Sequence, residues 1–467
     1  METKNSKKGN KMFNYIFDRN FTLFKLIVAL IAGLITTTHL DADLFDKSFS
    51  IDGLAVLDEH VQDRFEQFVV APDGSIFVVG STYANHAEKW NVLIAKYDST
   101  GQLDPSFGGD GTVELDIRHK NDEPIAISLQ DDGKVVVLSR AGIYTYLSRY
   151  HAYGAPDETF ANLTSGHVIN LPEITPNPPG DGPFSAPGFI AKGMTKWGNR
   201  MAVYSHEGAV AVYEEDGTID ENFGHLGVAW TTLSFASRLS IEDILMRDNK
   251  IYLFGMAYED GLPSVPAIYA MNADGTPFLE FGDGGVLVLP NDAMQETKSF
   301  VYNNGLFTMG GGNRIVQMDD NGILAGNLSI NGVVDLPDGT EVTDVVLQPL
   351  GRIAASVKMP DDEDGYESNK FSIVRLLSDG VADHNFSFST FGFESEGWFE
   401  MTYEEVTTAK QLFSYANGKL LAAGDFKQIT GNESVLLLRL NSTDSAPTRG
   451  VQGGPGGFQG LTTGSGR

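Results

Sequence analysis

Short apolar runs, each interrupted by a tight polar turn, recur along most of the chain. Residues 68–80 read FVVAPDGSIFVVG, in which two apolar segments flank Asp73-Gly74. Asp-Gly is a strong hairpin turn because both central positions accept a positive φ. Six similar units follow, around Gly133, Asn199, Asn249, Gly305, Gly351 and Gly418. The pattern predicts seven β-hairpins, separated by 46 (Gly305 to Gly351) to 67 (Gly351 to Gly418) residues, close to the length of one four-stranded propeller blade.

A second repeated segment places an aromatic residue after the third strand of each unit. Its copies read LDPSFGGDG, PDETF, IDENFGHLG, FLEFGDGG and ADHNFS, with a degenerate AGNLS, and centre on Phe107, Phe160, Phe223, Phe281, Phe386 and Leu328. A further copy, FDKSFSIDG at Phe49, precedes the first hairpin, and none follows the seventh. We therefore expect residues 53–57 to supply the outer strand of the last blade, which removes the open sheet edges.

Together these repeats predict an all-β protein. The expected fold is a seven-bladed β-propeller of four-stranded blades over residues 43–446, closed by an N-terminal strand that completes the last blade. The repeated Phe residues are expected to be buried between blades, and the glycines after them to allow tight turns.

The repeats resemble those of the bacterial delta-60 repeat family, which pair a D-G hairpin with an L-D-x-S-F-G-x-x-G segment. The resemblance covers about residues 41–446 and is strongest at 71–111, where APDGSIFVVG and LDPSFGGDG stand. It implies a propeller in an exported protein. The family carries no established common reaction, so the resemblance assigns no catalytic residues.

The N-terminus has the order of a secretory signal peptide. Several lysines precede an apolar run of ten residues, 26–35, and an acidic segment begins at Asp41. A spanning helix needs about 20 apolar residues, whereas a signal peptide needs about 7 to 15. We expect residues 1–42 to be a signal peptide cleaved near Ala42, with an uncleaved anchor over 21–35 as the alternative. The protein is then secreted, periplasmic or at the cell surface, with no membrane span after cleavage. A Gly-rich tail, 447–467, is expected to be disordered.

The net charge of the chain limits the classes of partner that it can bind. Sixty-two acidic and 33 basic residues give a formal net charge of −29. Nucleic-acid binders need clustered Lys and Arg, so the composition argues against them and against anionic membranes. The absence of cysteine excludes disulfides and Cys-ligated metals.

Loop lengths indicate one working face. Connections between second and third strands or between blades are long, whereas the other turns are tight. The long connections are 82–91, 170–188, 257–265, 358–369, 390–401 and 424–432. They are expected to converge on one face around the channel mouth, where loops on a rigid scaffold bind ligands. The alternative is neutral drift in loop length. The Pro-rich connection 170–188 resembles a lid or an exposed connector.

Two sets of residues on these loops could contact a ligand. Trp90, Trp230 and Trp398 could stack on sugars, with partial burial between blades as the alternative. An acidic run could offer oxygens to calcium, with a solvated loop as the alternative because the spacing of a dedicated calcium loop is missing. Its candidate ligands are Asp361, Asp362, Asp364 and Glu367. No other cofactor is indicated.

Motifs for catalysis are absent from the sequence. The histidines are scattered, and no H-E-x-x-H, G-x-S-x-G or phosphate-binding loop occurs. The run Gly310 to Gly312 is expected to be a turn between strands. The sequence favours a binding or scaffold module that presents its loop face to a glycan, peptide or surface protein. The alternative is a metal- or quinone-dependent propeller enzyme, such as a hydrolase, lactonase or dehydrogenase. Oligomeric state is not indicated.

Overall fold

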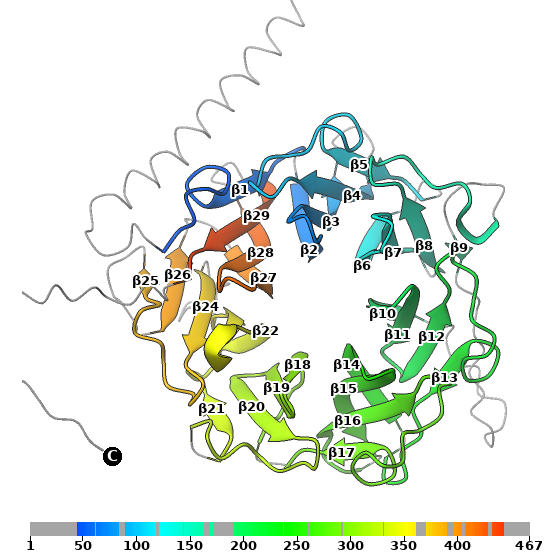
Figure 1. Ribbon diagram of the computed structural model, residues 1–467, viewed down its shortest axis with the longest axis vertical. Coiled ribbons are helices and arrows are strands. Elements are labelled where there is room, and N and C mark those ends of the chain that lie inside the picture. Colours follow the sequence, from blue (N-terminus) through cyan, green and yellow to red (C-terminus); the bar gives the residue numbers. More distant parts are fainter. Residues whose placement is uncertain are drawn as a thin grey trace, which may run out of the picture.

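A computed structural model shows antiparallel β-sheets arranged in a ring around a central axis (Figure 1). It describes residues 44–60, 62–83, 89–117, 121–142, 144–162, 169–170, 190–236, 238–259, 261–290, 293–329, 331–360, 370–389, 397–402, 407–427 and 432–442. Within these ranges the helical elements are two short 3-10 turns, η1 (Phe160–Asn162) and η2 (Pro349–Gly351). No helix of this part of the chain is long and apolar enough to cross a membrane.

Five sheets form separate blades, four with four strands and one with five. The first contains β6 (Asp122–Leu129), β7 (Val135–Ala141), β8 (Tyr144–Tyr150) and β9 (Ile169–Asn170). The second contains β10 (Ala191–Trp197), β11 (Arg200–Ser205), β12 (Ala209–Tyr213) and β13 (Val228–Trp230). The third contains β14 (Arg238–Arg247), β15 (Lys250–Tyr258), β16 (Val265–Asn272) and β17 (Val286–Val288).

The other two separate blades follow in chain order. One contains β18 (Ser299–Asn303), β19 (Leu306–Gly311), β20 (Arg314–Asp319) and β21 (Val333–Asp335). The next contains β22 (Glu341–Leu347), β23 (Ile353–Lys358), β24 (Lys370–Leu376), β26 (Trp398–Thr402) and β25 (Phe388–Ser389). Most of these strands are short. Many are buried along their middle and partly exposed at their ends, as expected for sheets that pack against neighbours on both faces.

The remaining eight strands form one sheet where the two ends of the chain meet. Its path is β27 (Thr407–Ser414), β28 (Leu420–Lys427), β29 (Glu433–Leu440), β2 (Gln62–Val70), β3 (Ile76–Tyr83), β4 (Trp90–Tyr97) and β5 (Thr112–Leu115). The eighth strand, β1 (Leu54–Leu57), pairs antiparallel with β29 through four residue pairs, from Leu54 with Leu438 to Leu57 with Val435. The predicted N-terminal closing strand is therefore confirmed.

The number of separate blades differs from the prediction. The structure has five separate blades and one eight-stranded sheet, not seven separate blades. The reason lies at the closing point: Gln62 of β2 pairs with Glu433 of β29, and this single parallel pair joins β2 to the sheet that holds β1. Repeat counting along the chain gives no sign of such a pairing, because it forms between residues from the two ends of the sequence.

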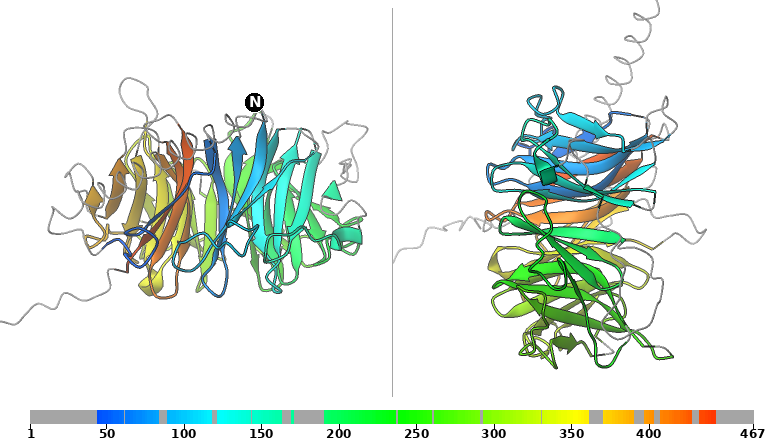
Figure 2. Two further views of the ribbon diagram at one scale, coloured as in Figure 1. Left: turned by 90° about the horizontal axis from the view of Figure 1, so that it is seen from above. Right: turned by 90° about the vertical axis from the view of Figure 1, so that its right-hand side faces the viewer.

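All seven predicted hairpins are formed. They are β2–β3, β6–β7, β10–β11, β14–β15, β18–β19, β22–β23 and β27–β28. The first strand of each hairpin lies nearest the axis in Figure 1. From the side, the molecule is a flat ring whose strands run between two faces (Figure 2). We call the face where these first strands begin the entry face, and the face that carries the hairpin turns the turn face.

The repeated aromatic residues are buried, as predicted. Five of them have no exposed surface, and neither has the substitute Leu328: Phe49, Phe107, Phe160, Phe223 and Phe386. The contact that Phe160 makes with the next blade is one example. A Cβ on Gly217, which has φ +87°, would come within 2.5 Å of the Phe160 ring. The Phe of one blade therefore packs against a turn glycine of the next blade.

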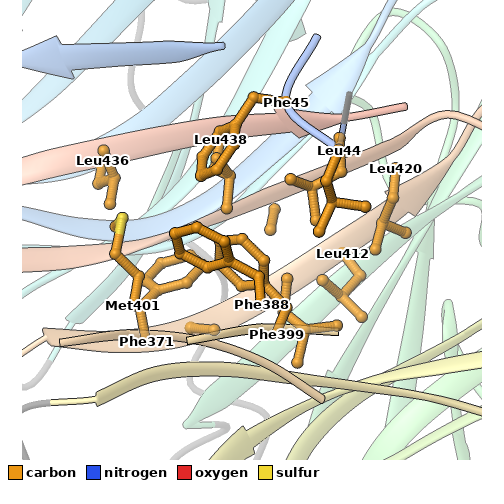
Figure 3. Close-up of a cluster of buried hydrophobic side chains, with 14 of the residues drawn as sticks. Leu44, Phe45, Phe371, Phe388, Phe399, Met401, Leu412, Leu420, Leu436 and Leu438 are labelled. Carbon is orange, nitrogen blue, oxygen red and sulfur yellow. The ribbon is translucent and has the colours of Figure 1, made fainter. Parts of the chain in front are cut away.

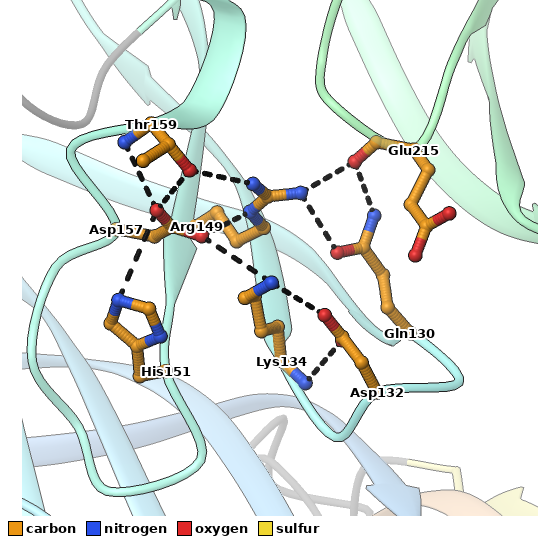
Figure 4. A network of polar contacts seen from close by, with 8 residues as sticks. All are labelled: Gln130, Asp132, Lys134, Arg149, His151, Asp157, Thr159 and Glu215. Atoms are coloured by element: carbon orange, nitrogen blue, oxygen red, sulfur yellow. Dashed lines mark hydrogen bonds and ion pairs between the residues drawn. The ribbon is translucent and has the colours of Figure 1, made fainter.

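A buried polar network accompanies this packing (Figure 4). Arg149 Nε donates to Asp157 Oδ2 at 2.9 Å, and Arg149 Nη1 donates to the Glu215 carbonyl of the next blade at 2.6 Å. The guanidinium carbon also lies 4.6 Å from the centre of the Phe160 ring. Arg439 and Asp46 repeat the arrangement, with Arg439 reaching the Ser99 carbonyl. The buried charged side chains of this network are thus paired and hydrogen-bonded.

Hydrophobic clusters fill the space between neighbouring sheets. In the cluster of Figure 3, the ring of Phe45 packs edge-on against Phe388, with the ring centres 5.2 Å apart. Phe45 is 2% exposed and comes from the segment just before β1. The N-terminal segment therefore contributes both a strand and a core side chain to the closure of the ring.

Candidate binding site on the entry face

Three hollows lie on the entry face, where the first strands of the hairpins begin. We name each after one lining residue. The Trp90 hollow, of about 660 Å³, includes Arg64, Glu66, Trp90, Glu123, Lys192 and His206. The Lys358 hollow, of about 670 Å³, includes Glu66, Lys298, Glu341, Lys358, Lys410 and Glu433. The Gly312 hollow, of about 790 Å³, includes Glu296, Gly312, Arg314, Asp335 and Glu341. This is the face that the loop lengths single out, and its use in binding stays a prediction.

Side chains reach the Trp90 and Lys358 hollows through β-bulges in the first strands. Six of these strands shift register by one residue against their partners. A bulge adds one residue to a strand and re-aims its side chain. The extra residues are Glu66, Ile125, Lys192, Glu242, Thr343 and Lys410. Five of them line the Trp90 or the Lys358 hollow, and Glu242 forms an ion pair with Lys192.

These bulge residues are not evident from the sequence, although they carry a weak signal there. Each stands seven or eight residues before the turn residue that marks its hairpin, as Glu66 does before Gly74 and Lys410 before Gly418. The signal is weak because the six positions hold acidic, basic, hydroxyl and aliphatic side chains, so no common residue type marks them.

The residue after each bulge often fastens one first strand to the next. Gln411 Oε1 accepts a hydrogen bond from Phe68 N at 2.7 Å, and Gln67 Oε1 accepts one from Ile127 N at 2.7 Å. Asp344 Oδ2 accepts one from Leu412 N at 2.8 Å. These bonds cross from blade to blade and hold the bulges in fixed positions, so the hollows are formed before any ligand arrives.

Two of these fastening residues have shifted pKa values. Burial raises the pKa of Asp243 to about 7, although its hydrogen bonds from Phe300 N and Ile244 N oppose the shift. Burial likewise raises the pKa of Asp344 to about 6, against the hydrogen bonds that it accepts from Leu412 N and the Ser299 hydroxyl. Both side chains keep partial contact with solvent, which weakens the shifts without reversing them.

Glu66 occupies the boundary that the Trp90 and Lys358 hollows share. Burial raises its pKa to about 7; Lys410 opposes the shift, and the nearby carboxylates of Asp425 and Glu123 add to it. The residue is nevertheless exposed at the mouth of the two hollows, so solvent screens much of this effect. The pKa of Glu66 is raised because the residue lies within the ring of first strands.

Ion pairs line much of the Lys358 hollow. Lys410 Nζ lies 2.6 Å from Asp425 Oδ2, and Lys298 Nζ lies 3.2 Å from Glu341 Oε1. A third pair joins Arg64 to Glu433 at 2.5 Å. The hollow is therefore polar and charged, with its cations held close to carboxylates from neighbouring strands.

Trp90 is the predicted aromatic residue that the structure places in a hollow. It begins β4, is half-buried, and its ring centre lies 5.4 Å from that of Tyr83. The Arg64 guanidinium lies 4.4 Å from the Trp90 ring centre. Trp230 and Trp398 line none of the three hollows and pack against hydrophobic clusters between sheets.

The other predicted sites are placed as follows. The candidate calcium ligands, Asp361, Asp362, Asp364 and Glu367, lie outside the described residues, as does most of the Pro-rich connection 170–188. Within the described ranges, no three His, Asp or Glu side chains are grouped to hold a metal ion. The glycine run is only in part the predicted turn: Gly310 and Gly311 end β19, and the turn begins at Gly312. A Cβ on Gly311 would come within 2.2 Å of the Glu296 carbonyl.

Ser240, His206 and Glu242 come together beside the Trp90 hollow. Ser240 Oγ lies 2.9 Å from His206 Nδ1 and 2.8 Å from Nε2, while Glu242 Oε1 lies 3.7 Å from the same Nδ1. A catalytic triad needs the acid and the serine on opposite ring nitrogens. Here the Ser240 hydroxyl lies at nearly equal distances from both ring nitrogens, in line with neither, and Ser240 is only 3% exposed, so this group does not form such a triad.

Part of the chain matches a known family. Residues 71–107 and 416–446 match a family described as a domain of unknown function (DUF5122) β-propeller. The first match contains the buried Phe107, and the second contains β28 and β29. Together with the fold, these matches define the class of the protein as a β-propeller. No curated protein sequence matches the chain.

Solved propeller structures resemble this chain only distantly. A catalytically inactive virginiamycin B lyase from Staphylococcus aureus with quinupristin is 12% identical, with 82% of this chain and 98% of that chain covered and a TM-score of 0.48. YCF48 from Cyanidioschyzon merolae is 11% identical, covering 83% and 98%, with a TM-score of 0.44. BamB from Moraxella catarrhalis is 12% identical, covering 82% and 98%, with a TM-score of 0.40. These likenesses say nothing about what this protein binds.

Proposed function

We propose that this protein is an exported β-propeller recognition module that binds a glycan, peptide or surface protein on its entry face. The observation that carries the proposal is the row of bulge residues that line the Trp90 and Lys358 hollows. Bulges are over-represented next to functional sites because they re-aim side chains. Here they recur in six first strands and are fastened from blade to blade, which favours binding by lowering the cost of ordering the site.

We also propose that the fold is a propeller of seven blades built from delta-60 repeats. The eight-stranded sheet is treated as two blades, β27-β28-β29-β1 and β2-β3-β4-β5. Its division is supported by the single residue pair, Gln62 with Glu433, that joins the two halves, whereas β1 and β29 share four pairs. With the five separate blades this gives seven, in agreement with the seven hairpins.

Export is proposed on the basis of residues 1–42. Their basic start and short apolar run are typical of a signal peptide. The mature protein would be secreted, periplasmic or at the cell surface, where it meets glycans and surface proteins. The Gly-rich tail 447–467 would act as a flexible extension.

Thermal unfolding of the purified protein tests the function. We would measure the melting temperature with neutral and acidic oligosaccharides, with peptides, with calcium and with a quinone cofactor, because a ligand that binds the native state raises it. We expect an oligosaccharide or peptide to stabilise the protein and Trp90→Ala to remove the shift. Lys134→Ala, near a hairpin turn on the turn face, is the control and should retain it.

Three results would overturn the proposal. Stabilisation only by a metal or a quinone, accompanied by turnover, would identify the enzyme alternative. Stabilisation by none of these compounds would leave the entry face without a recognition role for them. A shift that Trp90→Ala leaves intact would place binding elsewhere on the molecule.

A further inference from the structure

The Trp90 and Lys358 hollows form a continuous site. Both are lined by Arg64, Glu66 and Lys410, from β2 and β27, which are first strands at the closure of the ring. Each has a volume in the range that accommodates small ligands. A ligand longer than one hollow would therefore pass over Glu66 and contact both.

The Lys358 hollow reverses the charge balance of the chain. The chain has 33 basic and 62 acidic residues. Among the described residues, the hollow is lined by five cations and four carboxylates, the cations being Arg64, Lys298, Lys358, Lys410 and Lys427. A local excess of cations in a strongly acidic protein attracts an anionic group that the rest of the surface repels.

The carboxylates of this hollow do not neutralise its lysines fully. Glu341, Asp425 and Glu433 each pair with one cation, namely Lys298, Lys410 and Arg64. Lys358, at the end of β23, forms no ion pair with another described residue. The fourth carboxylate, Glu66, lines both hollows and has no ion pair with another described residue. Within the part of the chain that the structure describes, Lys358 can therefore bind an external carboxylate without breaking an ion pair.

The Trp90 hollow supplies a different kind of contact. The half-buried Trp90 ring stands beside polar side chains, among them Asn121, Glu123 and His206. Aromatic rings bind the C–H faces of sugars while neighbouring polar groups bind hydroxyls. Protein interfaces instead depend on large apolar anchors in deep pockets, and the lining of both hollows is mainly polar and charged.

We infer that the two hollows together bind an acidic oligosaccharide, with its carboxylates at Lys358 and Lys410 and one sugar ring against Trp90. This inference rests on the proposed function and names its ligand class. Lys410 donates to the Phe65 carbonyl and pairs with Asp425, so it is held in place, whereas Lys358 has no ion pair among the described residues and supplies the second charge. Glu66, between the two contacts, selects against ligands with a carboxylate at that position.

Calorimetric titration of the full protein tests the inference, with trigalacturonate as the probe. Maltotriose, a neutral trisaccharide, triglutamate, an acidic peptide, and inorganic phosphate are the comparison compounds. We expect trigalacturonate to bind, and the other three to bind at least tenfold more weakly. Lys358→Ala should weaken trigalacturonate binding about five- to tenfold, as expected for a lost charge-assisted hydrogen bond. Glu66→Gln, which removes a like charge, should strengthen it.

A matched lysine controls for general changes in charge. Lys196 lies at the opposite end of a first strand, near the turn face, in an exposed pair with Asp131. Lys196→Ala should leave the affinity unchanged, and all variants should keep the wild-type circular dichroism spectrum. Equal effects of Lys358→Ala and Lys196→Ala would overturn the inference, since a diffuse charge effect would then explain binding.

Failure of this inference is distinguishable from failure of the proposed function. Binding of maltotriose or triglutamate that depends on Trp90, without preference for trigalacturonate, would overturn the acidic oligosaccharide and keep the recognition module. Preferential binding of phosphate would indicate a simple anion site and also overturn the inference. No binding of any compound on the entry face would overturn both.

Discussion

The Phe160 ring lies directly against Gly217 of the neighbouring blade. Gly217 has φ +87°, and a Cβ there would stand 2.5 Å from Phe160 Cε2, closer than real contacts allow. The same relationship holds between Phe49 and Gly101, where the corresponding distance is 2.6 Å. At these two junctions, the repeated Phe and the turn glycine thus specify how one blade meets the next.

Gly217→Ala should lower the free energy of unfolding by about 2 to 4 kcal/mol, because it adds a clash with a buried ring to a strained backbone. Urea-induced unfolding measures the change. Gly305→Ala is the matched control: Gly305 has φ +86°, but a Cβ there meets no atom within 4 Å. It should cost only the backbone strain, about 1 kcal/mol. Equal losses for both variants would show that the contact with Phe160 is unimportant.

Arg149→Ala should destabilise the protein by about 3 kcal/mol, since it removes the guanidinium that pairs with the buried Asp157 and leaves the more distant Lys134, at 3.8 Å. The variant also lacks the hydrogen bond from Arg149 to the Glu215 carbonyl of the next blade. Lys196→Ala, which breaks an exposed pair with Asp131, should cost less than about 1 kcal/mol. Chemical unfolding of both variants checks the difference, and similar losses would contradict a structural role for the buried network.

Phe45→Ala should lower the free energy of unfolding by about 3 to 5 kcal/mol, because the ring is buried against Phe388 and Phe399. Its loss should also loosen β1 and promote aggregation through the exposed edge of β29. Thermal unfolding with light scattering measures both effects. Leu262→Ala, at a residue that is 62% exposed, is the control and should change neither. A melting temperature unaffected by Phe45→Ala would contradict closure through the N-terminal segment.

The stability of the protein should decrease as the pH rises from about 4 to 7, in part because of Asp243. Burial raises the pKa of this carboxyl to about 7, so the native state holds the proton more tightly than the unfolded chain does. Its contribution is therefore present below the unfolded pKa, about 3.9, and is lost as the pH rises through the native value. Asp243→Asn should flatten this part of the profile, measured by urea unfolding at several pH values. An identical slope in both proteins would contradict the raised pKa.

Much of the fold could be predicted from the sequence, since its determinants are local. Asp73-Gly74 and its six counterparts form turns within a few residues of sequence. The buried residues of the second repeated segment, from Phe49 to Phe386, recur once for each hairpin. The closing strand was also predictable, because one Phe segment stands before the first hairpin and none follows the last. The pairing of Gln62 with Glu433, which fuses two groups of strands, was not.

The entry face, where we propose that a ligand binds, follows from the loop lengths, but most of the residues that line its hollows do not. Loop lengths indicated the entry face, and Trp90 was singled out there with Trp230 and Trp398. Nothing in the chain distinguishes these three tryptophans, since their burial depends on the neighbouring blade. Lys358 and Lys410 were not identified because an isolated lysine in a strand is ordinary, and its importance appears only when strands from distant segments surround one hollow.

The sequence by itself determined the class of the fold, the order of the hairpins and the role of the repeated Phe residues, because each depends on short-range turn chemistry or on a repeated apolar contact. The tertiary structure alone decided which side chains share a hollow, how their charges pair, and where a one-residue bulge re-aims a strand. These properties depend on distances between residues such as Arg64 and Glu433, which are 369 positions apart in the chain and form one ion pair in the ring.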